Sequence, residues 1–356
     1  MAHRVTRIAY LISAAVLTAA AQTGNWNPGA AASYLDSRQG WWQSWPRAQR
    51  DQQTACVSCH TVLPYAMARP ILRGRLNQQE LAAPERTLLG FIEKRVGLWN
   101  STEPYYKANS GPTKPAESRG TEAVLNALIL AGYDAPTGHM RDVTRAAFDH
   151  AWALQLDSGA WDWLNFHYAP WETDDSQYWG TTLMAMAVAI APENYAEAPQ
   201  IRSGLQKMER WLRTGFSQQH LFNRAFLVWA SSRNASLVSA VDRKAVCEEL
   251  LSRQREDGGW SLASLGPWQR VDHTESEKRS DAYATAVALL ALQSGGSPAG
   301  IERARTWLIR NQERTGGSWP AWSPNKERDP ASEIGQFLRD AGTAYAVLAL
   351  DSVRVE

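Results

Sequence analysis

A unit that recurs about every 55 to 60 residues restricts the fold of this chain more than any other feature. In the two clearest copies, Gln254 is followed by Gly258, Gly259 and Trp260, and Gln312 by the same pattern at residues 316–319. A third copy covers residues 152–161, and a shorter first copy covers 34–41. Each copy follows an amphipathic segment and precedes an apolar one, so each is expected to be a helix that ends at a turn.

The second helix of each unit is rich in Ala and Leu and has few charged residues, so we expect it to be buried on most faces. The first helix carries Lys, Arg and Glu on one face and is expected to lie outside, as at 202–213 and 303–310. The expected inner helices are 62–72, 121–131, 180–191, 223–231, 282–292 and 342–350.

Six outer and inner pairs can be drawn, and the fourth is degenerate because Thr214, Gly215 and Phe216 replace the usual Gly and Trp. Stacked pairs bury a continuous core, and six of them can close into a ring without capping repeats. The sequence therefore predicts an all-α, single-domain α/α toroid over residues 22–356; the alternative is an open helical solenoid. The pairs are expected at 30–72, 82–132, 141–192, 199–232, 241–295 and 299–352.

The recurring Gln and Trp are expected to be structural in most copies. An indole ring just beyond a helix end can pack on the next unit, while the Gln amide bonds free backbone groups at that terminus. This explains part of an unusual composition, in which 17 of 356 residues are tryptophan.

The repeats resemble the Q-x-x-x-G-x-W motifs of the terpenoid cyclase and protein prenyltransferase superfamily, chiefly the squalene-hopene cyclases. The resemblance implies an α/α barrel and says little about the reaction, because proteins of one fold differ in chemistry. Squalene-type cyclases have two barrels and a catalytic D-x-D-D before an inner helix. Here Glu172, Asp174 and Asp175 stand in that kind of place. By resemblance Asp174 would donate the proton and Asp175 would assist it, whereas Glu172 departs from the motif's first Asp.

Protonation of an alkene requires a carboxylic acid held in its protonated form, with aromatic faces to stabilise the resulting carbocation. The alternative is that Asp174 and Asp175 cap a helix N-terminus, where carboxylates are favoured. The aromatic residues expected near this acid are Trp161, Trp163, Tyr168, Trp171, Tyr178 and Trp179, and all of them except Tyr168 are expected around a cavity.

Zinc is not expected. Residues 278–285 resemble the last inner-helix segment of the prenyltransferase β subunits, but Ala284 stands where the ligating His would be. Cys247 is predicted on an outer helix, with no companion ligand, and is expected to be an ordinary buried residue.

Cys56, Cys59 and His60 form the motif Cys56-Val57-Ser58-Cys59-His60, within a segment at 54–62. This is the attachment motif of c-type cytochromes, in which two thiols bind the haem covalently and the adjacent His ligates the iron. We expect a covalent haem c here, with a disulfide, another metal or a chance match as alternatives. The segment precedes the first inner helix, so the haem is expected at a mouth of the ring. His167 and His273 lie in loops of the same kind and are the candidate sixth ligands; an open sixth position is the alternative.

Residues 1–21 resemble a cleaved secretory signal, with a basic start followed by 14 apolar residues at 8–21. This predicts a periplasmic or secreted protein without a membrane span after cleavage. The net charge of +1, without a long basic run, argues against nucleic-acid binding.

These patterns favour an exported haem protein with redox, electron-transfer or haem-dependent oxidoreductase chemistry. Its expected partners are a hydrophobic, isoprenoid-like small molecule in the cavity and a periplasmic electron partner. The alternatives are an acid-initiated terpenoid cyclase that uses Asp174, and a non-catalytic lipid-binding or scaffold protein.

Overall fold

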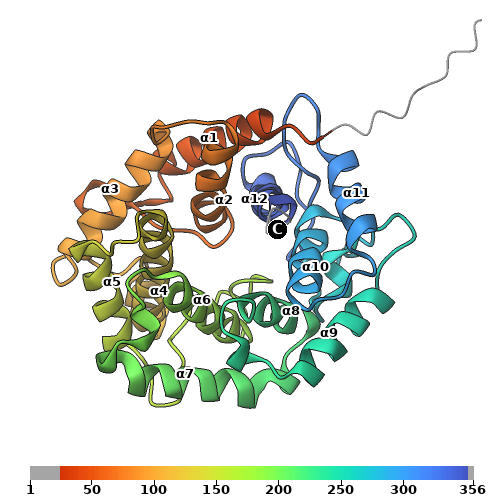
Figure 1. The fold of residues 1–356 in the computed structure, drawn as a ribbon. Coiled ribbons are helices and arrows are strands. Elements are labelled where there is room, and N and C mark those ends of the chain that lie inside the picture. The colour runs from red at the N-terminus through yellow and green to blue at the C-terminus, as the bar shows by residue number, and fades with distance from the viewer. Residues whose placement is uncertain (1–24, 352–356) are drawn as a thin grey trace, which may run out of the picture.

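The helices of this protein form two concentric layers around a ring (Figure 1). The computed structural model describes residues 25–351, which contain twelve α-helices. The outer layer consists of α1 (Pro28–Ser44), α3 (Ala83–Gly97), α5 (Asp142–Ala153), α7 (Arg202–Gly215), α9 (Ala240–Ser252) and α11 (Ile301–Asn311). The inner layer consists of α2 (Val62–Arg75), α4 (Lys114–Asp134), α6 (Ser176–Ile190), α8 (Leu221–Ala230), α10 (Ala282–Ser294) and α12 (Phe337–Asp351).

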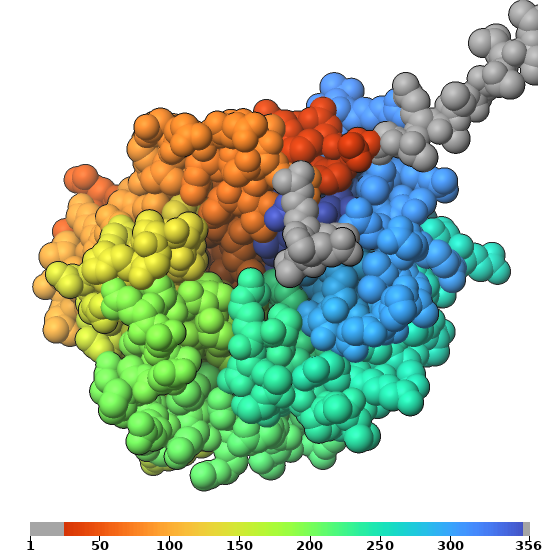
Figure 2. All heavy atoms as spheres, viewed as in Figure 1, coloured from red at the N-terminus to blue at the C-terminus, as the bar shows by residue number. Residues whose placement is uncertain are grey.

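The ring is closed, because the last helix packs against the first pair: α12 contacts both α1 and α2. The space-filling view also shows the red N-terminal helix beside the blue C-terminal part of the described chain (Figure 2). The all-α toroid predicted from the repeats is therefore confirmed, and the open solenoid is not the arrangement found. The predicted signal at 1–21 lies outside the described residues.

Burial explains the two layers. In α10 every residue from 282 to 292 is buried, whereas α7 has only Met208 and Leu212 buried. An inner helix touches neighbours on both sides and an outer helix behind it, so only small and apolar side chains fit on nearly all its faces. Among the described residues, no helix is long and apolar enough to cross a membrane.

A short hairpin of strands β1 (Gln49–Arg50) and β2 (Thr54–Ala55) interrupts the first pair. It connects α1 to the Cys56–His60 segment and ends one residue before Cys56. The connection therefore delivers this segment to the start of α2.

In three copies the recurring glutamine joins one unit to the next. Gln254 Nε2 donates to the carbonyl of Gly258 in its own loop, at 2.9 Å, and to that of Gly300 at the start of the next outer helix, at 3.0 Å. Gln155 repeats both contacts with Gly159 and Gly204. The motif tryptophans point back instead, since their indole N–H groups donate to carbonyls in the last turns of the preceding helices: Trp161 to Ala151, Trp260 to Leu250 and Trp319 to Leu308.

The last copy of this tie closes the ring. Gln312 Nε2 donates to the carbonyl of Asn27 at 2.9 Å, and its Oε1 accepts the Asn27 amide at 2.6 Å, across 285 residues of sequence. Asn27 is the N-cap of α1. Gly317 has a φ of 74°, and a Cβ there would lie 2.2 Å from the carbonyl oxygen of Ala30, so the turn requires glycine.

The first copy of the motif does not end its helix, contrary to the prediction. α1 continues through Gly40 and Trp41 to Ser44. Gln39 is fully buried, and its side-chain amide makes no hydrogen bond within the described residues. In the other three copies the helix ends one or two residues before the Gln, and a glycine four or five residues after the Gln takes a positive φ in the loop. In the first copy Gly40 directly follows Gln39 inside α1.

We predict that Gln312→Ala lowers the free energy of unfolding by about 1 to 3 kcal/mol, because the change removes three hydrogen bonds and leaves backbone groups of Asn27 and Gly317 unpaired. Urea denaturation followed by circular dichroism measures this. Gln218→Ala, at an exposed glutamine, is the control. Equal stability of the two variants would contradict the role given to the tie.

Candidate functional site

Loops that lead into inner helices gather at one end of the ring, and the Cys56–His60 segment is one of them. Trp42 Nε1 donates to the Cys56 carbonyl at 2.8 Å, and the Cys56 amide donates to the Ala48 carbonyl at 2.9 Å. The Ser58 hydroxyl accepts the amides of Thr61 and Val62, at 3.3 and 3.2 Å, and so supports the first turn of α2. These contacts fix the backbone of the segment on both sides.

Both cysteines of the motif are free thiols in a buried setting, with exposed fractions of 7% for Cys56 and 4% for Cys59. Burial raises the pKa of Cys56 to about 11, and it raises that of Cys59 well above the ordinary value. The carboxylate of Glu172 adds to both increases. The two sulfurs are therefore protonated thiols at neutral pH, and they do not form a disulfide.

His60 is neutral and has one free ring nitrogen. Desolvation, followed by the positive charges of Arg38 and Arg328, lowers its pKa to about 3. Its ring stacks on Phe337 with centroids 3.8 Å apart, and it meets the Trp42 ring edge-on at 5.0 Å. Phe337 therefore covers a face of the imidazole. His60 Nε2 makes no hydrogen bond to a described residue.

A hydrogen-bond relay fixes the tautomer of His60. Thr61 Oγ1 lies 2.8 Å from His60 Nδ1 and 2.7 Å from Asp340 Oδ2. The hydroxyl donates to the carboxylate of Asp340, so its oxygen accepts a hydrogen bond from the N–H group at Nδ1. This leaves the lone pair on Nε2. Asp340 is buried, and its other oxygen accepts from Arg38 and Tyr34, both at 2.8 Å.

The chemistry of this donor set fits a c-type haem. Attachment needs two unpaired thiols, and iron ligation needs a neutral imidazole with a free nitrogen that is held by a partner on its other nitrogen. Cys56, Cys59 and His60 supply these groups within five consecutive residues. Phe337 covers a face of the imidazole rather than the edge that carries Nε2, so the stacking is compatible with ligation.

A groove of about 560 Å³, which we call the tryptophan groove, is connected to His60 through the ring of Phe337. Its lining includes Trp41 and Trp45, which stack at 5.1 Å and each contact Phe337. The charged residues that line it are Lys326, Arg328, Glu327, Asp329 and Glu333. Arg328 makes no ion pair with a described residue, and burial lowers its pKa. The groove thus combines flat aromatic surface with charges of both signs, and its volume lies in the range of small-molecule sites.

The carboxylates of residues 172–175 occupy different environments. Asp174 has an 83% exposed side chain and accepts a hydrogen bond from Asn165 Nδ2 at 2.6 Å. Asp175 is also exposed, and although it stands at the N-cap position of α6, its side chain makes no capping bond. Glu172 faces the cysteines, and burial raises its pKa to about 7. The shielded carboxyl of this segment is therefore Glu172 rather than Asp174.

The five aromatic residues expected around a cavity are all buried, but they serve the protein core. Trp161 and Tyr178 donate hydrogen bonds to carbonyls of outer helices, and Trp163 donates to the Trp171 carbonyl. Trp179 packs against the Trp163 ring. Trp171 Nε1 donates to the hydroxyl of Tyr283, a residue of the inner helix α10, at 2.8 Å. Tyr168, by contrast, is 44% exposed.

From Trp171, aromatic contacts continue through the middle of the toroid. Ring centroids are 6.2 Å apart for His60 and Trp171, 5.4 Å for Trp171 and Tyr283, 5.0 Å for Tyr283 and Tyr345, and 6.0 Å for Tyr345 and Trp229. An unbroken series of rings thus connects His60 with the opposite end of the inner helices.

The two candidate sixth ligands lie on exposed loops. His167 has a 77% exposed side chain whose Nδ1 is 3.9 Å from Asp174 Oδ1, and His273 is exposed. Both have a φ of 59°. The structure shows no contact of either imidazole with His60.

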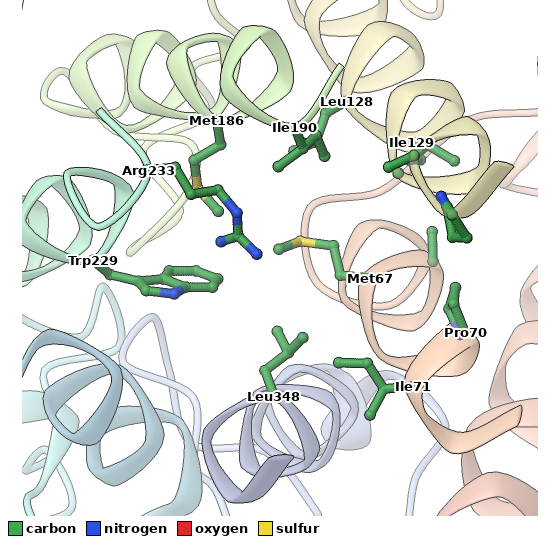
Figure 3. Close-up of a pocket in the computed structure, with 14 residues that line it drawn as sticks. Met67, Pro70, Ile71, Leu128, Ile129, Met186, Ile190, Trp229, Arg233 and Leu348 are labelled. Atoms are coloured by element: carbon green, nitrogen blue, oxygen red, sulfur yellow. The ribbon is translucent and has the colours of Figure 1, made fainter. Parts of the chain in front are cut away.

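An apolar cavity of about 490 Å³ opens where the inner helices end, and its lining was not anticipated from the sequence. Met67, Met186 and Trp229 contribute to it, and Arg233 is its charged residue (Figure 3). None of the five expected aromatics lines this cavity. Apolar residues at the ends of apolar helices give no signal that separates a cavity wall from a packed core.

Asp281 stands at the end of a stretch rich in charged residues, 275–281, yet it is buried. It is 3% exposed, and it accepts the amides of Ala284 at 2.9 Å and Leu262 at 2.6 Å. Burial raises its pKa to about 7, against the opposing effect of these bonds. It caps α10 and joins that helix to the loop after Trp260.

Comparisons with known proteins define the fold class alone. No family model and no curated protein match the chain. An inactive variant of the α-1,6-mannanase GH76A of Salegentibacter sp. HEL1_6, in complex with α-1,6-mannotriose, has 9% identity and a TM-score of 0.54 over 91% of this chain and 100% of that chain. This chain is thus an α/α toroid.

Two further solved structures are more distant. Type II terpene cyclase MstE from Scytonema has 14% identity and a TM-score of 0.46, over 91% of this chain and 99% of that chain. A possible GH105 family member from Salmonella enterica has 12% identity and a TM-score of 0.36, over 92% and 82%.

We predict that Asp281→Asn changes the pH dependence of stability. A carboxyl whose pKa is raised by folding stabilises the native state below its unfolded pKa, and that contribution is lost as pH rises through the folded value. Between about pH 4 and 7, the free energy of unfolding of the wild type should fall relative to the variant by about 1 kcal/mol per pH unit. Urea denaturation across this range measures the difference. The free energy of unfolding of Asp157→Asn, at an exposed carboxylate, should depend on pH as that of the wild type does. If Asp281→Asn showed the same dependence as the wild type, the raised pKa given to Asp281 would be wrong.

Proposed function

We propose that this protein is an exported c-type haem protein with redox or haem-dependent oxidoreductase activity, in which Cys56 and Cys59 attach the haem and His60 ligates its iron. The observation that carries the proposal is the state of these three side chains: two free thiols beside a neutral imidazole whose Nε2 is unpartnered among the described residues. A haem bound there would supply one-electron transfer or ligand and oxygen chemistry.

The surrounding residues have defined tasks in this proposal. Thr61 and Asp340 orient the imidazole and increase its basicity toward iron, as partners on the second nitrogen do in metal sites. Trp41 and Trp45 present flat apolar surface in the tryptophan groove.

The toroid contributes a second binding region. We propose that the apolar cavity where the inner helices end holds a hydrophobic, isoprenoid-like small molecule. The series of rings from His60 to Trp229 supports a coupling between the two regions, because indole and phenol rings can undergo one-electron oxidation. The signal-like 1–21 segment supports export and a periplasmic electron partner.

A cyclase that uses Asp174 is a weaker proposal. Its acid would have to be kept protonated in a dry site, and the Asp174 side chain is 83% exposed. No observation favours it over the haem protein, and for that reason we do not propose it as a second function.

We predict that protein produced in a host with haem-attachment machinery has an intact mass larger than the mature polypeptide by one haem. Cys56→Ala with Cys59→Ala should abolish this gain and the Soret absorption, whereas Cys247→Ala should retain both, since Cys247 lies in α9 away from the motif. An unchanged wild-type mass would end the haem proposal. Loss of the gain in the Cys247→Ala control would show that the assay reports folding rather than attachment.

Absorption spectra address the sixth position, for which His167, His273 and an open site are the proposals. Replacement of the coordinating histidine by alanine should shift the Soret band, and replacement of the other should not. Identical spectra for His167→Ala, His273→Ala and wild type would exclude both histidines and leave the position open or ligated elsewhere.

A further inference from the structure

The cavity where the inner helices end is apolar except for one residue. Side chains of α2, α4, α6, α8 and α12 form its walls and enclose about 490 Å³. Met67 and Met186 bring two flexible thioether side chains that adapt to ligands of different shape. This volume and lining are typical of a small-molecule site.

Arg233 gives this cavity a charge. It follows the end of α8, and Figure 3 shows its guanidinium extending between Trp229 and Met67. Among the described residues it has no ion pair and no side-chain hydrogen bond. Its guanidinium therefore does not bond to the free backbone carbonyls at the end of α8. Arg233 lines the cavity and is also exposed to solvent, and partial desolvation by its surroundings lowers its pKa.

An unpaired cation beside apolar walls is complementary to an anion that carries an apolar chain. The guanidinium provides five N–H donors in a planar fork that matches a carboxylate or a phosphate. The walls beyond it suit a hydrocarbon chain. A neutral hydrocarbon would fill the space between the apolar walls and leave the arginine without a partner.

We infer that the cavity binds an amphipathic anion, a hydrocarbon or isoprenoid chain that ends in a carboxylate or phosphate, with its charged group on Arg233 and its chain along Met67 and Trp229. This deepens the proposed function, because it rests on the proposed hydrophobic ligand and names its chemical class. It does not depend on haem attachment.

Calorimetric titration of the full protein with dodecanoate, dodecyl phosphate and dodecanol tests the role of the charge. Wild type should bind at least one of the anions about tenfold more tightly than the alcohol, and Arg233→Gln should remove that advantage and leave dodecanol binding unchanged. The tighter of the two anions identifies the head group. Arg314→Gln, at an exposed arginine that follows the outer helix α11, is the matched control and should bind as wild type does.

A second pair of variants tests the location. Gly132 lines the cavity, and a Cβ there would lie 3.8 Å from Ile190, in ordinary contact, so Gly132→Leu should fill the space and weaken all three ligands. Gly90→Leu makes the same change on the outer helix α3, where a Cβ meets nothing within 4 Å, and should have no effect.

The results that would contradict the inferred anionic head group differ from those that would contradict the proposed hydrophobic ligand. If dodecanol bound as tightly as the anions, or if Arg233→Gln and Arg314→Gln behaved alike, the inference would be overturned while the proposed hydrophobic ligand would survive. If none of the three compounds bound, both would be overturned. Neither result changes the mass that tests haem attachment.

Discussion

The hydrogen bonds between Gln312 and Asn27 hold the first and last helical pairs together, and the arrangement of both functional faces depends on that closure. The same kind of bond joins Gln155 to Gly204 and Gln254 to Gly300 within the ring. Each glutamine also binds its own loop, so it fixes where one outer helix ends relative to the start of the next. Repetition of this constraint brings the starts of the inner helices to one end of the toroid.

The two ends of the ring have different chemistry as a consequence. Where the inner helices begin, loops bring together thiols, an oriented imidazole, buried carboxyls and the tryptophan groove. Where they end, Met67 and Trp229 form part of an apolar cavity with the single charge of Arg233. Tyr283 and Tyr345 occupy the middle, in contact with each other, and lie between the two regions in the series of rings. A redox group on one side and a bound amphiphile on the other would therefore communicate through aromatic side chains rather than by direct contact.

The periodic features of the fold could be predicted from the sequence, and the features made by tertiary contacts could not. Apolar helices and Gln–Gly–Trp turns are local signals, so the inner and outer layers and the closed ring follow from them. The exposure of Asp174 and the burial of Asp281 depend on which loops pack over them, and both residues sit in similar charged strings of sequence. Gln39 shows the same limit: its motif resembles the others, but α1 continues through it to Ser44. Cys56, Cys59 and His60 could be selected because their spacing itself carries the chemistry, whereas the relay through Asp340 spans 279 residues and has no sequence signature.

The central claim is that these three residues hold a haem at the end of the ring where the inner helices begin. A crystal structure of the protein matured with haem-attachment machinery tests it most directly. The account predicts continuous electron density from the sulfur atoms of Cys56 and Cys59 to one porphyrin, with its iron bonded to His60 Nε2 and Thr61 still bridging Nδ1 to Asp340. A disulfide between the two cysteines, or free thiols beside an unligated imidazole in protein from that host, would contradict it.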